Sequence, residues 1–268
     1  MKPISRTRAD VKQPLAVPAM AANPETPNRG YFGNNHWWPH LPAKPADWEF
    51  TSTFLSRPLV ALLFYPVRTQ ASPNVITFVS LITGIAGAWL LLLDRWVNWG
   101  LGLLFLAMLF DDADGQLARY QGCSSRLGSF FDKSVDVVRF GLLFPIIGVL
   151  AFRESGSVMA AMAGPLAAFG LMVQGYTKWL TVACMPCKNE EKIAKNAPST
   201  STQHSWLRGF AVALLWPFHE CDLTLWVCIF GVFGQWTVLV WVLCISQLAA
   251  GMASMAARLA QVYAAEKQ

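Results

Sequence analysis

The stretch DDADGQLARYQGCSSRLGSFFDKSVD, residues 111–136, decides how this chain folds. Its carboxylates stand at the edges of strongly apolar segments, in a protein of which only 14% of the residues are charged. Ionisable side chains at membrane depth are costly, so they indicate a functional site. The stretch therefore predicts two facing membrane helices with an acidic site between them.

Helical periodicity places the acidic residues on two stripes, each of which also carries small side chains. The first stripe has the spacing i, i+3, i+4, i+7 and consists of Asp111, Asp114, Gly115 and Ala118. The second has the spacing i, i+4, i+8 and consists of Gly128, Asp132 and Asp136. Four anions close together repel one another, and hard divalent cations such as Mg²⁺ or Mn²⁺ relieve that repulsion. The spacing therefore predicts a metal site.

Apolar segments predict an all-α integral membrane fold with six transmembrane helices. The chain is 54% hydrophobic, and a span needs about 20 mostly apolar residues. The predicted spans are 74–93, 98–118, 134–152, 157–182, 222–235 and 236–261. The fifth is short, so we expect it to begin earlier, within the apolar stretch from Phe210, and to end at a tight turn at Gly234 and Gln235.

Composition divides the chain into three parts. Residues 1–46 are rich in proline and are expected to form a flexible N-terminal tail. Residues 47–70 alternate apolar and polar side chains and predict an amphipathic helix lying on the membrane, which Pro58 bends or restarts. Residues 71–263 form the predicted membrane domain.

Loop charge predicts the orientation of the spans. The external turns carry Arg95 and Arg153, whereas the other basic residues near the spans fall on the side of both termini. By the positive-inside rule, that side and the aspartate cluster are cytoplasmic. The net charge of +5 is explained by anionic lipid headgroups, because the basic residues flank the spans, so no nucleic-acid partner is expected.

The aspartate stretch resembles the signature of the CDP-alcohol phosphotransferases, integral membrane enzymes of phospholipid synthesis. The signature is Asp, two residues, Asp-Gly, two residues, Ala-Arg, eight residues, Gly, three residues, Asp, three residues, Asp. The matching residues are Asp111, Asp114, Gly115, Ala118, Arg119, Gly128, Asp132 and Asp136. Upstream, residues 73–77 resemble the family's Pro-Asn-x-x-Thr entry to the first span.

The resemblance implies an enzyme that transfers a substituted phosphate from a CDP-alcohol to an acceptor alcohol and releases CMP. It implies two divalent ions, Mg²⁺ or Mn²⁺, held by Asp111, Asp114, Asp132 and Asp136, with Asp136 also acting as general base. It also implies a cytidine nucleotide site, for which the candidates are Asn74, Thr77, Gly115, Ala118, Arg119 and Gly128. At least one substrate would then be a lipid, and the protein would lie in a bacterial inner membrane. A homodimer is a possible assembly.

Several alternatives stay open on the sequence alone. Arg139 lies on the second stripe and would contact a substrate anion or form a salt bridge with Asp136 or Asp132. Asn74 would serve the nucleotide or cap a helix. The run from Asp136 to Gly141 resembles the phosphatidylserine synthase branch, from which Arg139 departs. An ion or proton transporter is the alternative of another class, although broken helices and repeats are not visible.

Overall fold

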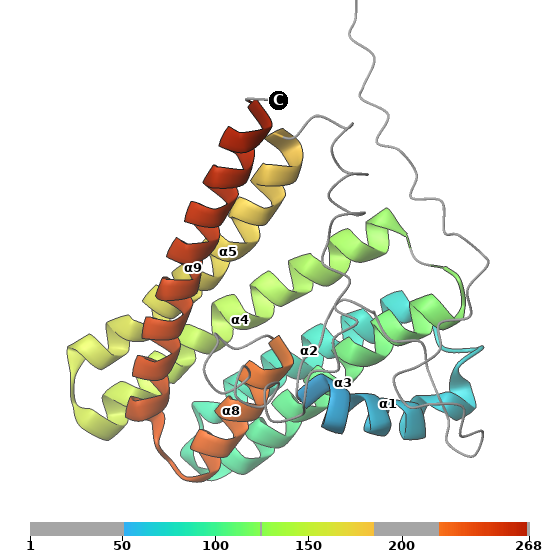
Figure 1. Ribbon diagram of the computed structural model, residues 1–268. Helices are drawn as coiled ribbons and strands as arrows, with labels where there is room; N and C mark the ends of the chain where they lie inside the picture. The colour runs from blue at the N-terminus through green and yellow to red at the C-terminus, as the bar shows by residue number, and fades with distance from the viewer. Residues whose placement is uncertain (1–50, 124, 185–219, 267–268) are drawn as a thin grey trace, which may run out of the picture.

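Helices make up nearly all of the described chain. The computed structural model describes residues 51–123, 125–184 and 220–266, and these ranges contain no strand (Figure 1). The α-helices are α1 (Arg57–Phe64), α2 (Pro73–Leu91), α3 (Val97–Tyr120), α4 (Arg126–Ser155), α5 (Val158–Cys184), α8 (Glu220–Val232) and α9 (Trp236–Glu266). The predicted tail and the start of the fifth span lie outside the described residues.

Helix α4 lies at the centre of the helical arrangement. It packs against α2, α5 and α9, while α2 also packs against α3, α3 against α8, and α5 against α9 (Figure 1). The side chains that α4 buries recur at intervals of three and four residues, as expected for one helical face. They include Phe140, Leu143, Phe144, Ile147, Leu150 and Ala151.

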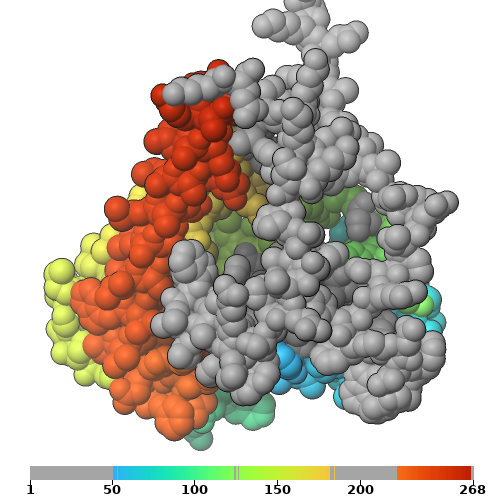
Figure 2. Space-filling model, in the orientation of Figure 1, coloured from blue at the N-terminus to red at the C-terminus, as the bar shows by residue number. Residues whose placement is uncertain are grey.

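Four described helices, α2, α4, α5 and α9, are long and apolar enough to cross a membrane. Helix α9 runs along one side of the molecule in Figure 2, and its outward side chains include the exposed Ile245, Met252 and Leu259. Such an apolar outer surface suits lipid contact. Helix α3 carries three aspartates and α8 has 13 described residues, and neither is among these four.

Glycines let the helices that carry the acidic site approach closely. A Cβ atom added to Gly87 on α2 would lie 2.9 Å from the carbonyl oxygen of Gly100 on α3. One added to Gly148 on α4 would lie 2.6 Å from the carbonyl oxygen of Ala161 on α5. Small residues at such crossings are typical of membrane helix packing, and here they let α2 approach α3 and α4 approach α5. The turn predicted before α9 is present, with Gly234 at φ +66°.

The segment before α2 packs on α3 near its acidic end. A π-helical turn at Ser52–Ser56 leads into α1, with Pro58 in the first turn of that helix. Val60 of α1 is buried in one cluster with Leu109 and Leu117 of α3. Gln121 donates to the carbonyl oxygens of Arg68 and Ala71, at 2.8 and 2.7 Å. These contacts hold the beginning of α2 beside the end of α3.

Candidate metal centre

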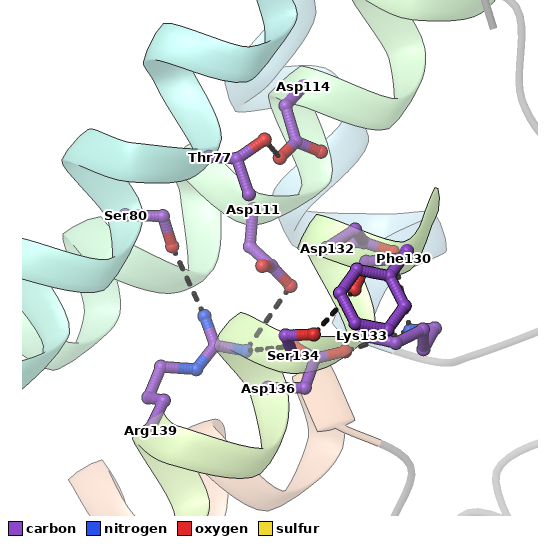
Figure 3. A network of polar contacts seen from close by, with 10 residues as sticks. All are labelled: Thr77, Ser80, Asp111, Asp114, Phe130, Asp132, Lys133, Ser134, Asp136 and Arg139. Carbon is purple, nitrogen blue, oxygen red and sulfur yellow. Dashed lines mark hydrogen bonds and ion pairs between the residues drawn. The ribbon is translucent and has the colours of Figure 1, made fainter. Parts of the chain in front are cut away.

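Two aspartates of α3, Asp111 and Asp114, continue its buried face. Leu104, Ala107, Asp111 and Asp114 follow one helical face, at intervals of three and four residues. The apolar members of this face pack inside the molecule, so the same geometry carries the two carboxylates inward. Figure 3 shows both pointing into the space between α2, α3 and α4.

Three carboxylates converge at this point. Asp111, Asp114 and Asp132 each offer an oxygen atom, and these atoms lie within 4.8 Å of one another. The Asp111 Oδ1 atom is buried and has no hydrogen-bond partner among the described residues. A buried carboxylate oxygen without a donor is costly, and hard divalent cations prefer oxygen ligands. The donor set therefore fits Mg²⁺ or Mn²⁺.

Asp136 lies beside this group but contacts two cationic side chains. The Lys133 ammonium is 2.8 Å from Asp136 Oδ2, and the Arg139 guanidinium is 3.2 Å from Asp136 Oδ1 (Figure 3). Arg139 is also 3.2 Å from Asp111 Oδ2. The structure thus contains the salt bridge to Asp136 that was one of two alternatives for Arg139. The assignments of Asp136 as ligand and as base stay predictions.

Helix α2 supplies two hydroxyl groups to the centre. The Thr77 hydroxyl hydrogen-bonds Asp114 Oδ2, and both side chains are buried. The Ser80 hydroxyl donates to the Ala107 carbonyl oxygen at 2.8 Å and accepts from Arg139 at 3.3 Å. Sequence reasoning missed Ser80, although its position three residues after Thr77 places it on the same helical face.

The predicted nucleotide residues Asn74 and Gly128 lie close together at the start of α4. A Cβ atom on Gly128 would lie 3.5 Å from Asn74 Oδ1, and the Ser125 hydroxyl caps α4 by accepting from the Gly128 amide at 2.9 Å. Asn74 is not a helix cap, because Ser72 is the N-cap residue of α2. Asn74 is exposed, and the side chain of Asp132 is 32% exposed, so the centre opens on this side.

The remaining signature residues lie one turn further along α3. The Arg119 guanidinium lies over Gly115, where an added Cβ atom would be 3.3 Å from Nη1. Ala118 and Arg119 are half-buried. Asp112, which lies off the stripe, is not part of the converging group and accepts a hydrogen bond from the Ser52 hydroxyl at 3.1 Å.

Comparison with known proteins gives a match in the part of the chain that holds this centre. Residues 70–202 match the family model of CDP-alcohol phosphatidyltransferase. This range contains α2 to α5 and every aspartate of the cluster.

Individual relatives match over shorter segments. A phosphatidylinositol phosphate synthase of Streptomyces avermitilis is 30% identical over 96 residues, and one of Cutibacterium acnes is 32% identical over 108 residues. An archaetidylinositol phosphate synthase of Aeropyrum pernix is 31% identical over 119 residues. The matches cover 36%, 39% and 40% of this chain, and 39%, 51% and 59% of those relatives.

Proposed function

We propose that this chain, whose residues 70–202 belong to the CDP-alcohol phosphatidyltransferase family, is a membrane enzyme of phospholipid synthesis. It would transfer a substituted phosphate group from a CDP-alcohol to the hydroxyl of an acceptor alcohol and release CMP. The observation that supports this most is the convergence of Asp111, Asp114 and Asp132. These are three of the four carboxylates in the signature that the sequence matches.

The three converging carboxylates would hold divalent cations, Mg²⁺ or Mn²⁺, and two ions are proposed. Bound there, the cations would neutralise the charge of the CDP pyrophosphate and polarise its phosphoryl oxygens. The Thr77 hydroxyl would orient Asp114 as a ligand, because a hydrogen bond to one carboxylate oxygen fixes the direction of the other.

Asp136 would accept the proton of the acceptor hydroxyl. The acceptor oxygen forms a bond to the phosphorus atom that carries the transferred group, and the bond from that phosphorus to the bridging oxygen breaks. CMP leaves with that electron pair. The Lys133 side chain is 43% exposed, so its contact with Asp136 lies at the open side, where an acceptor would enter.

The nucleotide would lie at the open side of the centre. Asn74 and Gly128 adjoin there, and the small side chains of Gly115 and Ala118 leave room along α3. Arg119 is proposed as a further nucleotide contact. Thr77 would act through Asp114, since its hydroxyl already bonds that carboxylate.

The donor is proposed to carry a lipid, such as diacylglycerol, because relatives are named for phosphatidylinositol phosphate synthesis. Purified protein should release CMP from CDP-diacylglycerol when a suitable acceptor is present. Inositol phosphate, glycerol phosphate and serine form the first acceptor panel, and serine would indicate the phosphatidylserine synthase alternative. CMP release is measured by chromatography, with the Asp111→Asn variant as background. No acceptor-dependent release from any CDP-linked donor would contradict the proposed reaction.

The proposed membrane arrangement has six spans, formed by α2, α3, α4, α5, a longer helix that includes α8, and α9. The segment 47–70 would lie on the cytoplasmic surface, after the tail 1–46 and before the membrane domain 71–263. The turn between α2 and α3 would then be external, and the turn between α3 and α4 cytoplasmic.

Cysteine labelling tests this orientation. Cys123 is exposed in the turn after α3, and Asp94, whose side chain is 91% exposed, lies in the turn before it. Single-cysteine variants that keep Cys123 or carry Asp94→Cys should react with an impermeant maleimide from opposite sides of the membrane. Inverted and right-side-out vesicles give the two measurements. Labelling of both positions from one side would contradict the proposal for α3.

A further inference from the structure

Arg139 is buried where three helices meet. Its side chain is 4% exposed, and its guanidinium lies 3.2 Å from Asp111 Oδ2 of α3 and 3.2 Å from Asp136 Oδ1 of α4. It donates to the Ser80 hydroxyl of α2 at 3.3 Å. Because these bonds run to three helices, this one cation links the elements that carry the acidic centre (Figure 3).

A slot on α2 is shaped to hold the Arg139 side chain. A Cβ atom at Gly84 would lie 2.9 Å from Arg139 Cδ and 3.2 Å from Cγ. The Phe140 ring centroid is 4.8 Å from Arg139 Cζ, which is a favourable distance between a guanidinium and an aromatic face. Ser80 is itself fixed by its bond to the Ala107 carbonyl oxygen. The guanidinium is therefore held in one position and has little freedom to follow a substrate.

The charges around Arg139 suggest what it does. Three carboxylates converge in the centre and that of Asp136 lies beside them, while Arg139 and Lys133 contribute two positive charges. An arginine cannot lose its proton in a protein, and a planar guanidinium can bond two carboxylates at once. Arg139 therefore neutralises part of the acidic centre whether or not a metal is bound. It also engages Asp111 Oδ2, one of the two oxygens of a proposed ligand.

We infer that Arg139 is a built-in counter-cation of the metal centre. From its place beside Gly84, its guanidinium holds the carboxylates of Asp111 and Asp136 in position and weakens the binding of divalent metal. The inference rests on the proposed function for the metal itself. It makes Arg139 a positioning residue, in place of the substrate contact that the sequence also allowed. A substrate anion would have to separate the guanidinium from two carboxylates to reach it.

Metal affinity in the absence of substrate tests the inference directly. Free Mn²⁺ is measured by electron paramagnetic resonance in titrations of the purified full chain. Arg139→Gln should bind Mn²⁺ about tenfold more tightly, because a nearby charge of the same sign as the metal is removed. In the presence of a chelator, the unfolding temperature of Arg139→Gln should be lower than that of the unaltered protein, and excess Mg²⁺ should restore part of the difference. Arg139→Lys keeps the charge but loses the planar fork that bonds two carboxylates, so its Mn²⁺ affinity should lie between that of Arg139→Gln and that of the unaltered protein.

A substitution at Gly84 should move the Arg139 guanidinium without removing it, and a substitution at Gly102 serves as its control. Gly84→Ala should displace the Arg139 side chain and shift Mn²⁺ affinity in the same direction as Arg139→Gln. Gly102→Ala on α3, where an added Cβ atom meets nothing within 4 Å, is the matched control and should leave the affinity unchanged. If Arg139→Gln does not fold, these two glycine variants still test whether the Arg139 guanidinium weakens Mn²⁺ binding.

Three results would overturn the inference. Equal Mn²⁺ affinities in the unaltered protein, Arg139→Gln and Gly84→Ala would leave no counter-cation role. If Arg139→Gln had a raised KM for the donor or the acceptor and an unchanged Mn²⁺ affinity, Arg139 would be a substrate contact instead. Absence of Mn²⁺ binding by the unaltered protein would contradict the proposed metal centre itself, and the inference with it.

Discussion

Replacement of Asp136 by asparagine is expected to lower the rate of CMP release by about 10²–10⁴-fold, the usual cost of losing a positioned general base. An amide keeps the size of the carboxylate but does not accept the proton of the attacking hydroxyl. Asp136 stands outside the group of three converging carboxylates, so binding of metal and CDP-donor should persist. Single-turnover CMP release and calorimetric donor binding measure the two properties separately.

Folding must be controlled in this experiment, because Asp136 accepts from the buried Arg139. The unfolding temperature of Asp136→Asn in detergent should be compared with that of Asp94→Asn, which alters an exposed carboxylate paired with Arg153 outside the centre. If Asp136→Asn abolishes donor binding as fully as Asp111→Asn does, Asp136 is chiefly a metal ligand. A water or another group would then take the proton.

Helical periodicity was sufficient to predict the two acidic stripes. Spacings of three and four residues place Asp111 and Asp114 on one face of a helix, and Asp132 and Asp136 on one face of the next. The structure brings the first three of these carboxylates together on α3 and α4. The predicted segment 98–118 falls within α3, although α3 is not among the four described helices that are long and apolar enough to cross a membrane.

The partners of these residues could not be predicted, because they depend on how separate helices pack. Nothing local relates Gly84 to Arg139, yet the missing side chain of one makes room for the other. The buried carboxylate of Asp222 accepts from the Thr51 amide, 171 residues away in the chain. Periodicity gives the face on which a side chain lies, whereas the bond from Arg139 on α4 to Asp111 on α3 depends on how two separate helices are placed.

Loss of metal is expected to abolish the reaction altogether. Chelation should abolish CMP release, and added Mg²⁺ or Mn²⁺ should restore it. The carboxylates and the pyrophosphate are both negatively charged, so cations are needed to neutralise the pyrophosphate. Asp111→Asn should weaken Mn²⁺ binding by about 100-fold or more, since loss of a ligand exceeds the 10–100-fold cost of losing a residue that supports one. Donor affinity should fall in parallel, because the pyrophosphate would be held mainly through the cations.

Asp112→Asn is the matched control, since it removes the same charge from the neighbouring position of α3. The Asp112 carboxylate accepts from Ser52 and is not part of the converging group, and an asparagine oxygen can still accept that bond. Its Mn²⁺ affinity and CMP release should therefore stay close to those of the unaltered protein. An equal loss in both variants would mean that net charge, and not ligation, governs metal binding. Full activity in metal-free buffer would contradict the metal mechanism, whatever the variants show.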